Sequence, residues 1–116
     1  RLMQMALTMD EVTAKCMEMI GYTGEGRSLV YEAAGLMVEE DYQAAMGKIE
    51  EAEANLSKAH EIQFLKLMSV QARGDEIPCS MLLLHAMDIL MTSTAEKDMI
   101  KAIVKAKIKK AGGGRT

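Results

Sequence analysis

The sequence predicts an all-α protein, a three-helix up-down-up bundle. Of its 116 residues 49% are hydrophobic, twelve are Met and one is Pro. Ala, Leu and Met outnumber Val and Ile, which favours helix over strand. Three long segments carry apolar or small residues at three-four spacing, the pattern of a helix that packs on one side. A chain of this length has room for one core, so we expect one domain over residues 1–111 and a flexible tail over residues 112–116.

The first segment predicts a helix that begins at Thr8 or just after Asp10 and ends near Gly35. Its glycine-rich stretch, residues 21–26, is the weak point, because each glycine costs about 1 kcal/mol relative to alanine inside a helix. Propensity alone therefore allows a break in this stretch. The apolar stripe consists of Val12, Cys16, Met19, Thr23, Gly26, Val30 and Ala33.

The second segment predicts one helix of about 34 residues, roughly 50 Å long. Its stripe consists of Tyr42, Ala45, Ile49, Ala52, Leu56, Ala59, Gln63, Leu67 and Val70. The residues that follow, Arg-Gly-Asp-Glu-Ile-Pro at positions 73–78, are typical of a helix end and a new start. Gly74 is expected to end the helix, a polar residue to cap the next one, and Pro78 to lie in its first turn.

The third segment begins at Ile77 and ends in a lysine-rich stretch, residues 105–110. Its stripe consists of Ile77, Met81, Leu84, Asp88, Met91, Ala95, Ile100, Ile103 and Val104. Over residues 81–91 every side chain is apolar except His85 and Asp88. A helix that is apolar on all sides is buried on all sides, yet a helix of a three-helix bundle keeps one side in water. Self-association through this helix resolves the conflict, so we expect a homo-oligomer in which His85 and Asp88 are shielded from solvent.

Charge and composition exclude several classes of function. A net charge of −3 gives no broad attraction for nucleic acid or anionic lipid. No apolar run approaches the roughly 20 residues that span a bilayer, so we expect no membrane insertion. Cys16 and Cys79 are too few for a disulfide scaffold or a zinc site, and residues 1–4 lack the layout of a secretory signal. We expect a reduced, cytoplasmic protein.

His85 is the leading candidate for chemistry. A neutral imidazole is a good nucleophile near pH 7 and takes a phosphoryl group on one ring nitrogen while the other forms a hydrogen bond. A core histidine satisfied by a hydrogen bond is the competing interpretation.

Asp88 lies on the stripe of the third segment. If that stripe faces a symmetry axis, copies of Asp88 converge, and a divalent cation or shared protons must compensate their charges. An ion pair with Lys or Arg of another helix is the alternative.

His60 is a second polar candidate. With Gln63, three residues later on the same side of the helix, it interrupts an otherwise alanine-rich stripe. We expect these residues to support His85 by orienting its ring or a bound phosphate. A local role at the helix surface is equally compatible with the sequence.

Three segments together resemble one known family. They are Gly-Glu-Gly-Arg-Ser at 24–28, Ala-His-Glu-Ile-Gln at 59–63 and Leu-His-Ala-Met-Asp-Ile-Leu-Met-Thr at 84–92. In this order and spacing they resemble the lactose/cellobiose enzyme IIA components of the bacterial sugar phosphotransferase system. The resemblance covers residues 12–104.

The resemblance implies three-helix protomers that assemble as a homotrimer with their third helices at the shared core, and a helical conformation for residues 21–26. It implies that His85 accepts a phosphoryl group from phospho-HPr and passes it to a cysteine of enzyme IIB during disaccharide uptake. It also implies that Asp88 lies at the threefold axis, where a divalent metal ion such as Mg²⁺ binds. Met87 and Ile89 depart from the family pattern, which has Gln and His at these positions.

Two alternatives remain at this stage. One is a structural helical homo-oligomer with little or no phosphotransfer activity, in which buried His85 and Asp88 set the register of the helices. The other is a two-component histidine phosphotransfer domain, which fits less well because it carries a different motif on a four-helix bundle.

Overall fold

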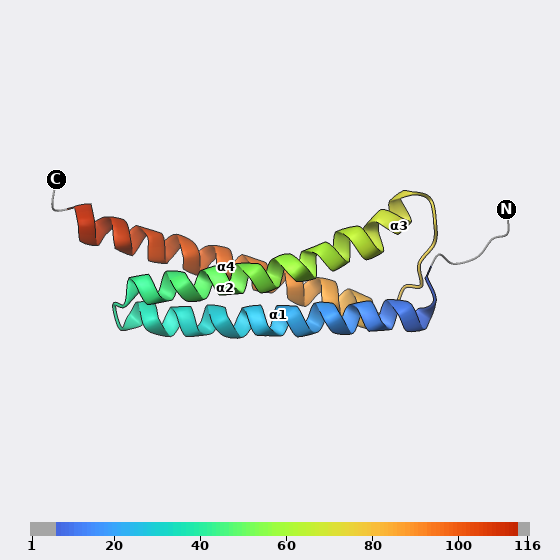
Figure 1. The fold of residues 1–116 in the computed structure, drawn as a ribbon, viewed down its shortest axis with the longest axis horizontal. Coiled ribbons are helices and arrows are strands. Elements are labelled where there is room, and N and C mark those ends of the chain that lie inside the picture. Colours follow the sequence, from blue (N-terminus) through green and yellow to red (C-terminus); the bar gives the residue numbers. More distant parts are fainter. Residues whose placement is uncertain (1–6, 114–116) are drawn as a thin grey trace.

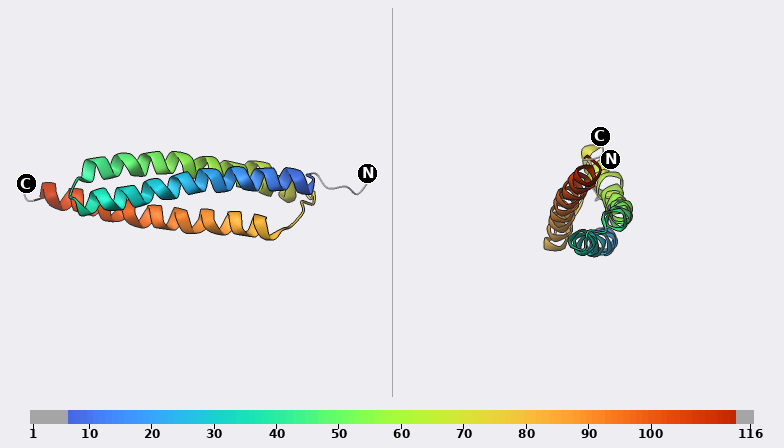
Figure 2. Two further views of the ribbon diagram at one scale, coloured as in Figure 1. Left: turned by 90° about the horizontal axis from the view of Figure 1, so that it is seen from below. Right: turned by 90° about the vertical axis from the view of Figure 1, so that its left-hand side faces the viewer.

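The computed structural model describes residues 7–113, and all of its regular elements are helical. They are α1 (Met9–Val38), α2 (Tyr42–Glu61), the π-helix η1 (Ile62–Met68), α3 (Ser69–Ala72) and α4 (Met81–Gly113). The elements α2, η1 and α3 follow one another directly and form one rod (Figure 1). The chain runs along α1, returns along this rod and runs back along α4 (Figures 1 and 2). The predicted all-α up-down-up bundle is confirmed.

The start of α1 is fixed by a capping box. The Glu11 backbone N–H donates to Thr8 Oγ1 at 3.1 Å, and the Thr8 backbone N–H donates to Glu11 Oε1 at 3.1 Å. Two N–H groups that have no partner inside the helix are thereby satisfied. The earlier of the two expected starts is therefore the observed one.

The glycine-rich stretch of α1 is helical, as the family resemblance implied. Gly26 is buried against α2, where a Cβ atom would lie 2.9 Å from Leu56 Cγ. Gly21 and Gly24 are exposed, and a Cβ atom there would meet nothing within 4 Å. Only Gly26 is thus required for close packing of the two helices.

The end of α1 lies three residues beyond the expected Gly35. The backbone N–H groups of Glu40 and Asp41 donate to the carbonyl oxygens of Met37 and Leu36 at 3.0 and 2.9 Å. This is the Schellman pattern, and it places Glu40 in the left-handed region with φ 65°. The stop depends on these hydrogen bonds and not on a glycine.

The rod of α2, η1 and α3 ends as predicted. Gly74 has φ 92°; its N–H donates to the carbonyl of Gln71 at 3.0 Å, and the N–H of Asp75 donates to that of Val70 at 3.3 Å. The rod spans residues 42–72 without a break, but seven of its residues form the π-helix η1, which the sequence did not predict.

The start of α4 differs from the prediction. The helix begins at Met81, not at Ile77, and Pro78 lies in the irregular connection before it. Ser80 is the capping residue, because its Oγ accepts the Leu83 N–H at 3.1 Å. At its other end α4 continues through residues 112 and 113 of the expected tail. Residues 114–116 of that tail, and the first residues of the chain, lie outside the described range.

Over residues 81–93 the core contains a different side of α4 from the predicted stripe, whereas Val104 of that stripe is buried. Met81, Leu84 and Met91 of that stripe are 87%, 53% and 67% exposed. The side chains that α4 buries against α1 and the second rod are Leu83, Ala86, Leu90, Ser93 and Val104. Because α4 is apolar on two sides, its periodicity does not show which side faces its own chain. Within residues 7–113 no helix is long and apolar enough to cross a lipid bilayer.

Candidate functional site

The helix α4 has three distinct sides, and its contacts with α1 and α2 define two of them. Its α2-facing side bears Thr94, Lys97 and Lys101; Lys97 Nζ and Lys101 Nζ lie 3.2 and 2.6 Å from Glu53 Oε2 of α2. Its α1-facing side bears Ile89 and Glu96. The third side, which we call the outer face, consists of Met81, Leu84, Asp88, Met91 and Ala95.

His85 lies on the α1-facing side of α4. It precedes Ile89 by four residues and Glu96 by eleven, and such spacings return to the same side of an α-helix. The side chain is exposed within the single chain. Asp88 is exposed as well, so one protomer alone does not shield the two side chains, and the expected shielding depends on further copies.

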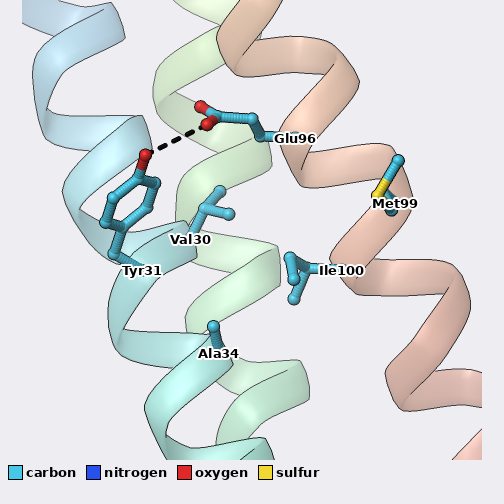
Figure 3. A pocket seen from close by; sticks show the side chains of 6 residues that line it. All are labelled: Val30, Tyr31, Ala34, Glu96, Met99 and Ile100. Carbon is cyan, nitrogen blue, oxygen red and sulfur yellow. Dashed lines mark hydrogen bonds between the residues drawn. The ribbon is translucent and has the colours of Figure 1, made fainter.

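A shallow groove runs between α1 and α4 on this side. One part, about 250 Å³, is lined by Gly24, Arg27, Ser28, Tyr31 and Ile89. The next part, about 330 Å³, is mostly apolar and lined by Val30, Tyr31, Ala34, Glu96, Met99 and Ile100 (Figure 3). His85 lies one turn before Ile89, so it stands at the edge of this groove.

A polar cluster bridges the groove between its two parts. Arg27 Nε lies 3.3 Å from Glu96 Oε1. Figure 3 shows the second contact, in which the Tyr31 hydroxyl donates to Glu96 Oε2 at 3.0 Å. The Arg27 guanidinium also donates to the Tyr31 hydroxyl at 2.9 Å. Hydrogen bonding to Tyr31, and then the charge of Glu96, raise the pKa of Arg27. The cluster keeps a fixed cation beside the groove.

Asp88 lies on the outer face, three residues after His85, and is exposed. In the part of the chain that the structure describes, no three His, Cys, Asp or Glu side chains gather closely enough to hold a metal ion. One protomer thus offers a single carboxylate at this point. A cation site at Asp88 would require Asp88 from other copies.

His60 and Gln63 are not brought to His85 within one chain. His60 Nε2 lies 3.2 Å from Thr94 Oγ1, and the His60 ring stacks on Phe64 with centroids 6.1 Å apart. Thr94 follows His85 by nine residues, about two and a half turns, and so points from the opposite side of α4. Gln63 lies half-buried in η1.

The two departures from the family pattern have different environments. Met87 packs against the core cluster that contains Leu83 and Leu90, whereas Ile89 lines the groove. A thioether is at best a weak acceptor, and an isoleucine side chain offers no hydrogen bond. Positions 87 and 89 therefore lack the polar groups that the resemblance led us to expect there.

Sequence reasoning missed the ion network between α2 and α4. Burial raises the pKa of Glu53, but hydrogen bonds from Lys101 and Lys97 outweigh it, so the net pKa is lowered. For Lys97, burial lowers the pKa, and hydrogen bonds to Asp98 and Glu53 leave it raised. No local signal marks these pairs, because they join helices far apart in the sequence.

The cysteines are unpaired, as expected. Cys16 is buried and Cys79 exposed, and both are free. Burial raises the pKa of the Cys16 thiol, which makes it a poor nucleophile.

A comparison with known protein families shows which family the chain belongs to. Residues 14–107 match the family model described as "PTS system, Lactose/Cellobiose specific IIA subunit". The chain belongs to this family. The resemblance drawn from the three motifs is confirmed, and this IIA protein is a phosphohistidine carrier of a sugar phosphotransferase system. The interpretation as a purely structural oligomer is not supported.

Individual relatives agree with this assignment. The lactose-specific EIIA components of Staphylococcus epidermidis and Streptococcus mutans are each 32% identical over 95 residues, covering 82% of this IIA chain and 90% of theirs. Among solved structures, PtcA of S. mutans has a TM-score of 0.84 at 32% identity, covering 89% of this chain and 100% of PtcA. The cellobiose-specific enzyme IIA of Bacillus anthracis has a TM-score of 0.78 at 25% identity, covering 91% and 94%.

Proposed function

We propose that His85 is the residue that carries the phosphoryl group. One neutral ring nitrogen attacks the phosphorus of phospho-HPr in line with the phosphorus–nitrogen bond of the donor histidine. That bond breaks as the new one forms, and its electron pair returns to the donor ring. Catalysis consists of positioning and of stabilising charge on the equatorial oxygens. The observation that carries this proposal is the exposure of His85 at the edge of an open groove.

The second transfer delivers the phosphoryl group to enzyme IIB. The thiolate of a IIB cysteine attacks the phosphorus, the bond to His85 breaks, and the imidazole is regenerated. Uptake of a disaccharide such as lactose or cellobiose is the process served, in keeping with the names of the relatives. Membership of the family implies that the carrier works in the cytoplasm.

The direct test is phosphorylation by the upstream proteins. Incubation with phosphoenolpyruvate, enzyme I and HPr is expected to add the mass of one phosphoryl group in an acid-labile linkage. The His85→Ala variant should lose this gain and His60→Ala should keep it. A gain that survives in His85→Ala would show that another residue is the acceptor.

We further propose that the protein is a homotrimer assembled through the outer face of α4. An exposed, contiguous apolar face is typical of a protein–protein interface. Two other copies of α4 would cover Met81, Leu84 and Met91. Sedimentation of Met91→Glu should show smaller particles than wild type, whereas Val38→Glu, at an exposed site on another helix, should not. Equal sedimentation of wild type and Met91→Glu would argue against this interface.

A divalent cation fits this assembly only at the axis. Three Asp88 carboxylates would hold the cation there, because carboxylate oxygens are ligands that Mg²⁺ prefers. When bound, the ion would neutralise the converging charges. The Asp88→Leu variant should keep its helix content and lose metal measured by elemental analysis; unchanged metal content would exclude the site.

His60 and Gln63 act indirectly in this proposal. The His60 contact with Thr94 fixes α2 against α4, and Gln63 lies in the next turn. These residues support the position of the helix that carries His85, not the phosphoryl group itself.

A further inference from the structure

We infer that the bundle consists of two halves that open separately, and that the half distant from His85 opens while the half that carries His85 stays folded. The His85 half consists of residues 9–22, 56–72 and 81–90. The distal half consists of residues 29–38, 42–52 and 97–113. A polar layer, which we call the waist, lies between them and consists of residues 23–28, 53–55 and 91–96.

The buried apolar side chains form separate clusters in the two halves. The cluster of the His85 half consists of Val12, Cys16, Met19, Leu56, Ala59, Leu67, Leu83, Ala86 and Leu90. The distal half holds two clusters that meet at Ile100 and consist of Leu29, Val30, Ala33, Ala45, Ile49, Ala52 and Val104. Among the described residues, no half-buried apolar side chain packs against clusters of both halves. Parts of a protein that share few buried apolar contacts open separately.

The waist contributes no large apolar side chain to the core. Residues 23–28 read Thr-Gly-Glu-Gly-Arg-Ser, and only Thr23 and Gly26 of these six are buried. Over residues 91–103 of α4, Ser93 alone is buried. The hydroxyl groups of Thr23 and Ser93 have no hydrogen-bond partner among the described residues. This layer therefore loses the hydration of two polar groups and gains little from apolar burial.

Thr23 and Ser93 lie at the same level of the bundle. The helices α1 and α4 run in the same direction (Figure 1), and Arg27 Nε lies 3.3 Å from Glu96 Oε1. Thr23 precedes Arg27 by four residues and Ser93 precedes Glu96 by three, which is about one helical turn in each case. The two unpartnered hydroxyl groups thus belong to one layer that crosses the core.

The polar contacts near the waist join neighbouring helices and do not join the two halves. Lys97 Nζ and Lys101 Nζ contact Glu53 Oε2 at 3.2 and 2.6 Å, so these pairs run across the bundle. Ion pairs that are partly exposed contribute little to stability. Along α1 the halves are joined through a stretch with glycine at positions 21, 24 and 26. Glycine forms helix poorly, so unwinding of the distal part of α1 can stop there.

The distal half has the weaker core. Three of its seven buried core residues are alanine, whereas four of the nine in the His85 half are leucine. Stabilisation by burial increases with the apolar area removed from water, so the distal half opens at the lower free energy. His85 consequently remains on a folded helix during these openings.

Hydrogen exchange of the full chain, followed by NMR, measures the opening of each half. The probes are the backbone amides of residues 14–19, 29–34 and 46–51, which lie on α1 and α2 and not on the outer face of α4. We expect residues 29–34 and 46–51 to exchange faster than residues 14–19, relative to their intrinsic rates. The reverse order would overturn the inference. Since the protein is not phosphorylated, the outcome does not depend on the proposed function.

A matched pair of variants tests whether the halves open separately. Gly21→Ala and Gly35→Ala both replace an exposed glycine of α1 at which an added Cβ meets nothing within 4 Å. Gly21→Ala should slow exchange at residues 14–19 about fivefold and leave residues 29–34 and 46–51 unchanged. Gly35→Ala should slow all three probes, because the His85 half opens only once the distal half is open. Equal slowing of all three probes in Gly21→Ala would show one cooperative unit and overturn the inference.

A third variant tests the waist itself. Thr23→Val replaces the unpartnered hydroxyl by a methyl group and extends apolar packing from Met19 towards Leu29. Exchange at residues 29–34 and 46–51 should slow about fivefold, whereas Ser28→Val, at an exposed site of the waist, should leave it unchanged. Unchanged exchange of these residues in Thr23→Val would show that the polar layer does not separate the halves, and would also overturn the inference.

Discussion

Replacing Gly26 by alanine tests the closest packing in the bundle. The added Cβ would lie 2.9 Å from Leu56 Cγ, 3.0 Å from Leu56 Cδ2 and 3.3 Å from the carbonyl oxygen of Ala52. Cγ is the branch point of the leucine, and the oxygen belongs to the α2 backbone, so a simple side-chain rotation does not relieve both contacts. Overpacking costs about 1–3 kcal/mol, against a gain of about 1 kcal/mol in helix propensity.

We expect Gly26→Ala to lower the free energy of unfolding by about 1–2 kcal/mol, because an overpacking cost near the top of its range exceeds the gain in helix propensity. For a chain of about 100 residues this corresponds to a melting temperature roughly 4–8 °C lower. Thermal unfolding should be followed by circular dichroism at one protomer concentration, because assembly makes the midpoint concentration-dependent. Gly47→Ala, where an added Cβ meets nothing within 4 Å, is the matched control and should raise the midpoint.

The cause of the effect can be checked by a double-mutant cycle. Leu56→Ala removes the atoms that the new Cβ meets, so the cost of Gly26→Ala should be smaller in that background. A melting temperature that rises in Gly26→Ala as it does in Gly47→Ala would refute the packing argument.

Three further variants test other local features. Glu40→Gly should stabilise the protein by about 1 kcal/mol in thermal unfolding, because the left-handed φ of 65° at Glu40 costs a residue with a Cβ atom about that much. Thr23→Val should stabilise it by about 1–2 kcal/mol in chemical denaturation, because the buried Thr23 hydroxyl has no hydrogen-bond partner; a loss of stability would contradict this reason. Glu53→Gln should destabilise the protein by about 1 kcal/mol at neutral pH. Since the pKa of Glu53 is lowered from its ordinary 4.5, this contribution is present above pH 4.5 and lost as pH falls through the folded value. The difference between wild type and Glu53→Gln should therefore shrink below pH 4.5, and a difference independent of pH would exclude the ion network as its source.

Features that are set by residues adjacent in the sequence were predicted well. The start at Thr8, one of the two expected starts of α1, and the stop at Gly74 are local features, and both are observed. The π-helix η1 was not predicted, because one extra residue per turn is accommodated through tertiary packing and leaves no mark in the apolar spacing. The start of α4 was placed too early because Pro78 was assigned to a first turn, whereas Ser80 provides the cap.

The candidate site was predicted in its residue types but not in its surroundings. The three motifs at 24–28, 59–63 and 84–92 together identified the family, and the family comparison confirms that assignment. The groove and the cluster of Arg27, Tyr31 and Glu96 depend on how α1 and α4 align, and Glu96 lies 69 residues from Arg27. A periodic pattern does not fix such an alignment.

The first half of the predicted stripe of α4 lies outside the core of its own chain, and in the proposed trimer this one helix serves three tasks. If α4 had only to complete the core of its own chain, Leu83, Ala86 and Leu90 would suffice. Polar residues on the outer face would then be more favourable in contact with water than apolar ones. The exposed apolar side chains there are best explained by contact with other copies. The remaining side presents His85 beside α1. Because the three sides are separate, substitutions should separate their effects: Ser93 variants act on folding, Met91→Glu on assembly, and His85→Ala on phosphoryl transfer.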